Sequence, residues 1–195
     1  MKEAVLYGVK EFKIIETSKP TIGPDDVFIK VKACGICGSD MHSYRRGASS
    51  IKTPQKLVLG HEFSGEVTEV GSEVTEVQVG DRVGVEPLVG CGQCYFCRCG
   101  DYHLCDKLEH LGGQRKGGFA EYALIPQDKV YKLPENISFE EAALLDAPGE
   151  TAIEIEPLES SYFCSLSACI LKLNVISAKI RMITAVNVFF KFYNL

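Results

Sequence analysis

Residues 91–105 read CGQCYFCRCGDYHLC, and this stretch holds five of the nine cysteines of the 195-residue chain. Cys91, Cys94, Cys97 and Cys105 follow the spacing C-x2-C-x2-C-x7-C. Four thiolates can close a tetrahedron around zinc, and a site that uses all four positions leaves no room for water. We therefore expect a structural zinc that holds together a loop with little apolar core of its own.

Two alternatives for this loop stay open, because disulfide bonds and an iron–sulfur cluster also use cysteines. Residues 1–10 show no apolar run behind a basic start, which predicts no secretory signal and a reducing, cytoplasmic location. In such a compartment a tight cysteine cluster indicates metal more often than disulfides. Cys99 is left over from the spacing, and we expect it to be an oxidisable bystander.

The composition limits the kind of partner. The formal net charge is −5, which disfavours nucleic acid and anionic membrane surfaces, since both attract clustered Lys and Arg. Basic residues also interrupt the apolar run near the C-terminus, so no clean membrane span of about 20 residues exists. We predict no nucleic acid and no membrane partner, and a small uncharged molecule as substrate.

Outside the loop, the pattern predicts short strands broken by glycines in residues 4–33 and 60–85, and another strand after Gly117 and Gly118. Around residues 27–33 the alternation assigns opposite faces to two sets: Val27, Ile29, Val31 and Ala33, against Phe28, Lys30 and Lys32. Such spacing is typical of a barrel or sandwich. Ser138 and Glu141 form a capping box that opens a helix running through Leu145 to Pro148.

Two further segments carry residues suited to chemistry: ACGICGSDMH at 33–42 and LGHEFSG at 59–65. Each is weak alone, because a single His before a strand is more often a structural hydrogen-bonding group than a ligand. Asp40 is at least as well explained as a capping or turn residue. Their meaning depends on their combination with the cysteine loop.

Together, the segments GHEFSGEV, VGDRV and the four-cysteine loop resemble the zinc-containing medium-chain alcohol and polyol dehydrogenases, from Met1 to about Asp146. The resemblance implies a mainly β fold: a GroES-like, partly open barrel over residues 1–148, with a zinc-stapled lobe at about 88–112 and few short helices. This family includes the sorbitol, threonine and butanediol dehydrogenases, whose substrates are secondary alcohols or polyols.

The same resemblance implies a second, catalytic zinc. Cys37 and His61 would bind it, with Glu62 beside them as a supporting carboxylate or alternate ligand. Asp146 is the best match for the remaining protein ligand, and Glu156 is the alternative. An open coordination position would bind and acidify an alcohol oxygen, and hydride would pass to NAD(P). Ser39 would take the substrate proton and pass it toward His42. We thus expect two Zn²⁺ ions per chain.

The composition changes after Gly149. Residues 149–195 form an atypical tail: no glycine follows Gly149, and no acidic residue follows Glu159. A dinucleotide-binding Rossmann domain needs glycines in its first turn, so we expect that domain to be absent, the chain to be truncated relative to the family, and the chain alone to be inactive.

Two other functions stay open at this stage. The chain could be a non-catalytic zinc-binding subunit that associates with full-length relatives through exposed edge strands. It could also associate with copies of itself as a homo-oligomer. It could also be a structural domain without chemistry.

Overall fold

The computed structural model describes residues 1–47 and 56–145, so the expectations for Asp146, Glu156 and the tail lie outside the described residues. The elements, in chain order, are β1 (Lys2–Gly8), β2 (Glu11–Glu16), β3 (Asp26–Cys34), α1 (Gly38–Arg46), β4 (Leu57–Val58), β5 (Phe63–Val70), β6 (Arg82–Val85), β7 (Leu88–Val89), α2 (Tyr95–Cys99), η2 (Tyr102–Leu104), β8 (Glu109–His110), β9 (Tyr122–Pro126), η3 (Gln127–Lys129), β10 (Val130–Lys132) and α3 (Phe139–Ala143).

An antiparallel five-stranded sheet, in the order β10-β6-β5-β3-β9, carries the main core. Val27 and Ile29 of β3 are fully buried, as the alternation predicts. Phe28, which the alternation assigns to the opposite face, is also buried, with only 4 % of its surface exposed. Its ring stacks on Tyr122 at 5.1 Å, and the pairing of β3 with β5 shifts register between Phe28 and Ile29. The neighbouring ring therefore covers Phe28, whereas Lys30 and Lys32 of the same predicted face are exposed.

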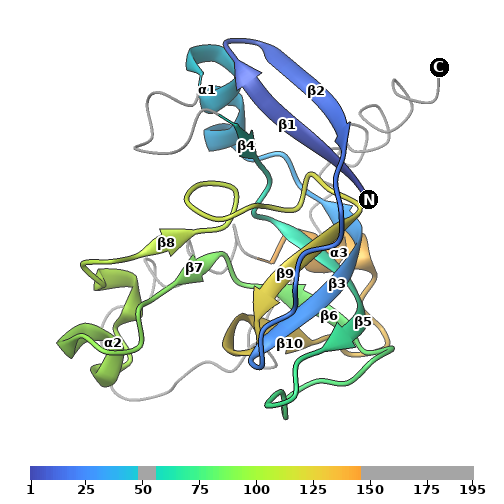
Figure 1. The fold of residues 1–195 in the computed structure, drawn as a ribbon. Coiled ribbons are helices and arrows are strands. Elements are labelled where there is room, and N and C mark those ends of the chain that lie inside the picture. Colours follow the sequence, from blue (N-terminus) through green and yellow to red (C-terminus); the bar gives the residue numbers. More distant parts are fainter. Residues whose placement is uncertain (48–55, 146–195) are drawn as a thin grey trace.

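A second sheet, in the order β2-β1-β4, contacts the segment that leads into β9. Glu3 forms an isolated antiparallel bridge with Ala120, and the Ala4 amide donates to the Phe119 carbonyl at 2.8 Å. Phe119 packs against all three apolar clusters of the core. The two sheets thus enclose a common interior, in agreement with the expected mainly β, partly open barrel (Figure 1).

The cysteine loop projects from the barrel as a separate lobe on the two-stranded ribbon of β7 and β8 (Figure 1). Its two short helices, α2 and η2, contain no buried residue. We call residues 88–110, from the start of β7 to the end of β8, the cysteine lobe. Hydrophobic burial within its helices cannot hold this lobe together, so another interaction must do so.

The capping box at Ser138 is present at the start of α3. The Glu141 amide donates to Ser138 Oγ at 3.1 Å, and the Ser138 amide donates to Glu141 Oε2 at 2.9 Å. The predicted continuation through Leu145 is wrong, since the helix ends at Ala143. Ala142 and Ala143 are buried, whereas Leu144 is 41 % exposed, so a further turn would gain little apolar burial. No helix in residues 1–47 or 56–145 has the length and apolar character needed to cross a membrane.

Candidate metal centres

The four cysteines of the lobe converge on one point. The Sγ atoms of Cys91, Cys94, Cys97 and Cys105 all lie within 4.8 Å of one another. Cys91 Sγ and Cys97 Sγ are 4.0 Å apart. A regular tetrahedron with zinc–sulfur bonds of 2.3 Å has edges of about 3.8 Å. The donor set and its spacing therefore fit a tetrahedral thiolate site.

Backbone amides support this cluster by donating to its sulfur atoms. The amides of Cys94, Cys97 and Lys107 donate at 3.3 to 3.4 Å to the sulfurs of Cys91, Cys94 and Cys105, respectively. Backbone hydrogen bonds from Gln93 and Cys94 lower the pKa of Cys91 to about 6. Such bonds stabilise a thiolate, which is the form that binds metal.

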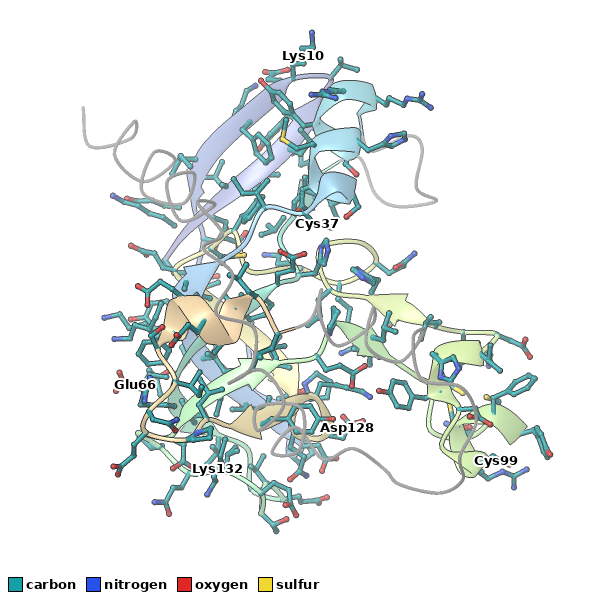
Figure 2. All side chains as sticks on the ribbon, turned by 180° about the vertical axis from the view of Figure 1, so that it is seen from behind. Lys10, Cys37, Glu66, Cys99, Asp128 and Lys132 are labelled. Atoms are coloured by element: carbon teal, nitrogen blue, oxygen red, sulfur yellow. The ribbon has the colours of Figure 1, made fainter. Side chains whose placement is uncertain are left out.

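The pKa of a second cysteine in the cluster is shifted in the opposite direction. Burial, and then the side chain of Cys94, raise the pKa of Cys97 to about 12. Four sulfurs this close cannot all carry a negative charge unless a positive charge lies among them. All seven cysteines of the described ranges are free, so the disulfide alternative is not realised there. Cys99 is exposed, outside the four-sulfur group, and lies on the lobe, far from Cys37 (Figure 2).

A second cluster joins the two segments that the sequence separates. Ligand atoms of Cys37, His61 and Glu62 lie within 4.8 Å of one another. Cys37 precedes α1, and residues 61–62 lie between β4 and β5. His61 and Glu62 are each 7 % exposed, and Cys37 is half-buried. One thiol, one imidazole and one carboxylate are the mixed donors of a zinc site that keeps a position open.

Asp40 holds these two segments together. Its Oδ2 accepts from the Cys37 amide at 2.9 Å, and its Oδ1 accepts from the Gly60 amide at 3.2 Å. The same Oδ1 lies 3.7 Å from His61 Nδ1. Asp40 is only 4 % exposed, so these contacts replace the water that its side chain gives up on burial. The sequence suggested a capping or turn residue, and the structure adds a link between the two ligand-bearing segments.

A pocket of about 200 Å³ opens beside this cluster. Its lining residues are Ser39, Asp40, Ser43, Leu59, His61, His110, Gly112, Gly113 and Gln114. Ser39 is therefore placed where a substrate could contact it. His42 lies three residues further along α1, so Ser39 and His42 share one face of the helix. His42 is exposed.

His110 also lines this pocket, although no sequence pattern pointed to it. Its ring meets the ring of His61 edge to face, with centroids 4.8 Å apart. His110 is the last residue of the cysteine lobe, far in the chain from both segments that carry the candidate ligands, and belongs to no motif. Only the pairing of β8 with β7, which returns the chain to the barrel, brings it to the site.

Cys34 lies close to the cluster but has a different character. Its thiol is 8 % exposed, and burial raises its pKa, with the negative charges of Asp40 and Glu62 acting in the same direction. A thiol held in the neutral form is a poor zinc ligand and a poor nucleophile. Of the two cysteines in residues 33–42, only Cys37 has its sulfur within the group formed with His61 and Glu62.

Comparisons with known proteins show which family the chain resembles. The family pattern described as "Alcohol dehydrogenase GroES-like domain" matches residues 23–135. The chain is 45 % identical over 148 residues to a sorbitol dehydrogenase of Bacillus subtilis, covering 75 % of this chain and 42 % of that protein. It is 42 % identical over 145 residues to an L-threonine 3-dehydrogenase of Shewanella baltica, covering 74 % of this chain and 42 % of that protein.

A solved structure gives the same result. A protein from Sinorhizobium meliloti, described as a zinc-binding dehydrogenase and bound to NADP, superposes with a TM-score of 0.71 and 33 % sequence identity. The match covers 82 % of this chain and 46 % of that one. The chain thus spans about two fifths of the length of the curated relatives that it matches.

Proposed function

The chain belongs to the alcohol dehydrogenase GroES-like family, whose named relatives are oxidoreductases, and on that premise we propose the role of each of its two clusters. Residues 1–148 would form the zinc-binding catalytic domain of a dehydrogenase that oxidises a secondary alcohol or polyol with NAD(P). The observation that carries this proposal is the convergence of Cys37, His61 and Glu62 beside a pocket that Ser39 also lines.

In this proposal Cys37 and His61 hold a catalytic zinc, and Glu62 is a supporting carboxylate or alternate ligand. When bound, zinc supplies Lewis acidity to the alcohol oxygen. Ser39 accepts the proton that the substrate hydroxyl loses, and His42 passes that proton to solvent, to which it is exposed. NAD(P) is the hydride acceptor, so the alcohol becomes a carbonyl compound, and we assign no residue of this chain to NAD(P) binding.

Asp146 is our choice for the remaining protein ligand, with Glu156 as the alternative. The helix α3 supports this choice, because it is anchored on the barrel and ends at Ala143, three residues before Asp146. Ser64 Oγ donates to the Phe139 carbonyl at 2.6 Å and fixes the start of the helix. Asp146 lies closer in the sequence to this anchored element than Glu156 does.

The cluster of Cys91, Cys94, Cys97 and Cys105 would hold a second, structural zinc. Its four donors leave no open position, so we propose that it stabilises the cysteine lobe and takes no part in the reaction. The free cysteines of the described ranges are compatible with a reducing, cytoplasmic location, which we also propose.

Metal analysis of two variants tests both assignments. We expect the purified wild-type chain to contain two zinc equivalents, Cys37→Ser to lose one of them with the fold intact, and Cys94→Ser to lose the other together with the structure of the lobe. Cys99→Ser, on the same lobe but outside the cluster, is the control and should keep both. Loss of the same single zinc in Cys37→Ser and Cys94→Ser would show that one of the two sites is misassigned.

We also propose that the 195-residue chain alone binds zinc but does not oxidise alcohols. No glycine follows Gly149, so the chain offers no glycine-rich turn for a pyrophosphate. The assay is turnover of a polyol or secondary alcohol with added NAD or NADP, followed by nicotinamide absorbance. Measurable turnover by this chain alone would overturn the proposal.

A non-catalytic zinc-binding subunit is the second candidate. It is favoured by β2 and β10, which each pair with one neighbouring strand in the described part of the chain and so present an open edge. Size-exclusion chromatography with an intact homologue separates the candidates, because only the subunit function predicts a specific mixed oligomer.

A further inference from the structure

A buried lysine lies where the cysteine lobe meets the barrel. The side chain of Lys129, in η3, is only 5 % exposed. Its Nζ lies 3.3 Å from Glu86 Oε2 and 3.6 Å from the centroid of the Tyr102 ring. A buried ammonium group needs such partners, because it has given up its water.

Lys129 and these two partners come from three different parts of the fold. Lys129 belongs to the barrel, Glu86 lies between β6 and β7 at the root of the lobe, and Tyr102 belongs to η2 in the lobe itself. The Glu86 amide also donates to the Lys129 carbonyl at 3.0 Å. Burial, followed by the negative charge of Glu86, raises the pKa values of Tyr102 and Tyr131. Lys129 therefore has its full set of partners only when the lobe is seated on the barrel.

The root of the lobe is also connected to the pocket. Pro87 follows Glu86, and its carbonyl accepts from the Leu111 amide at 3.0 Å. The next residue, Leu88, pairs with His110 across the β7–β8 ribbon. His110 in turn contacts the ring of His61 and lines the pocket. A shift of the ribbon at Glu86 would therefore move His110.

We propose that Lys129 is a positioning residue: by binding Glu86 and Tyr102 it seats the cysteine lobe on the barrel and so places His110 against His61. The relevance of this placement for catalysis rests on the proposed function. The placement itself does not, because it concerns only the position of one ring relative to another.

The four histidines of the chain make this position measurable. In the zinc-loaded, ¹⁵N-labelled full chain, the nuclear Overhauser effect between the rings of His61 and His110 reports their contact, once single His→Gln variants have assigned the signals. We expect it to be lost in Lys129→Met, while the signals of His42 on α1 and the zinc content stay unchanged. Lys129→Arg should restore it, because a guanidinium can also pair with Glu86 and lie over a ring.

Lys132→Met is the matched control. Lys132 lies three residues further on, its side chain is 53 % exposed, and it pairs with Asp81 at 3.0 Å instead of with the lobe. Figure 2 shows Lys132 farther from the lobe than Asp128, the residue that precedes Lys129. This variant should keep the His61–His110 effect at wild-type strength.

Tyr102→Leu provides a second route if Lys129→Met does not fold, because it removes the ring from the lobe and leaves Lys129 and Glu86 paired. It should also lose the effect. Persistence of the His61–His110 effect in a folded, zinc-loaded Lys129→Met or Tyr102→Leu protein would overturn the inference. If the wild-type chain binds only the structural zinc and Lys129→Met still loses the effect, the inference is supported and the proposed catalytic zinc is not. Failure of the inference and failure of the proposed function are therefore distinguishable.

Discussion

Asp40 shows how one buried side chain can hold a divided site. Cys37 lies directly before α1 and His61 lies after β4, so the two residues belong to separate segments of the chain. The two carboxylate oxygens of Asp40 accept one amide from each segment. Removing either acceptor would therefore change the separation of the two ligands as well as the charge beside them.

We predict that Asp40→Asn weakens the affinity for the proposed catalytic zinc about 10- to 100-fold, as is usual for groups that orient metal ligands. The affinity for the proposed structural zinc should stay unchanged. The amide side chain offers only one acceptor oxygen, so one of the two amides loses its partner. Competition with a chromophoric chelator resolves the two zinc affinities. Asp106→Asn makes the same change at an exposed position and should have no effect. Equal weakening of both zincs would contradict the role given to Asp40.

Gly60 is a second position where a single atom matters. It precedes His61, has a φ of +86°, and a Cβ there would lie 2.5 Å from Phe119 Cδ1 and 2.8 Å from Cys34 Sγ. Both the backbone conformation and the packing exclude a side chain. Because Phe119 contacts all three core clusters, it has little freedom to move away.

Gly60→Ala should therefore destabilise the protein by more than backbone strain alone. Gly80 supplies the matched control, since its φ is +93° but nothing lies within 4 Å of an added Cβ. We expect Gly80→Ala to cost about 1 to 2 kcal/mol of unfolding free energy, and Gly60→Ala about 1 to 3 kcal/mol more, because of overpacking. Urea denaturation of the zinc-loaded proteins measures both. Similar losses in the two variants would show that Phe119 can yield.

At the scale of elements, local rules predicted what local interactions determine. The start of α3 followed from the capping box of Ser138 and Glu141, which needs only four residues. Its end did not, because burial of Ala142 and Ala143 against the sheet decides how much helix is useful. Helix α1 was not predicted, since its polar sequence GSDMHSYRR has no apolar stripe and its place depends on the site.

The capping box makes the stability of the α3 region pH-dependent. Hydrogen bonds from the backbone and side chain of Ser138 lower the pKa of Glu141. A lowered pKa in the folded state means that the carboxylate adds stability above its usual pKa, and that this is lost as pH falls through the lowered value. The contribution is about 1 kcal/mol at most, because Glu141 is largely exposed.

Glu141→Gln isolates this contribution, because glutamine keeps an acceptor for the capping box but does not titrate. We expect the wild type to be more stable than Glu141→Gln near pH 7, and the difference to shrink as the pH falls below the usual carboxyl pKa of about 4.3 and through the lowered pKa of Glu141. Urea denaturation across this range measures it, and loss of zinc in acid affects both proteins alike. Glu140→Gln makes the same substitution one residue earlier, at an exposed position outside the capping box, and is the matched control. A difference that persists in acid would exclude the carboxylate as its source.

At the scale of the whole molecule, the two candidate sites differ in how much the sequence could reveal. The four cysteines lie within 15 residues, so their spacing alone suggested a cluster. Cys37 and His61 lie on separate elements, and only a resemblance over three quarters of the chain paired them before the structure brought them together. His110 and Lys129 belong to no motif, because their places depend on how the lobe returns to the barrel.

This division between lobe and barrel predicts an unequal response to metal removal. The apolar core lies in the barrel, around residues such as Ile29, Phe63 and Val83, whereas the helices of the lobe bury nothing. Structural zinc in small thiolate sites contributes on the order of 10 kcal/mol to folding. A strong chelator should therefore unfold the lobe and leave the barrel folded.

Hydrogen exchange followed by mass spectrometry can test this response peptide by peptide. On chelation, amides of residues 90–108 should exchange rapidly while those of β3 and β5 stay protected, and added zinc should restore the lobe. Cys94→Ser should show the same fast exchange without chelator, whereas Cys99→Ser should behave as the wild type, because its sulfur lies outside the cluster. If β3 and β5 lost protection together with the lobe, the metal would stabilise the barrel as well, and the lobe could not be an independently unfolding unit.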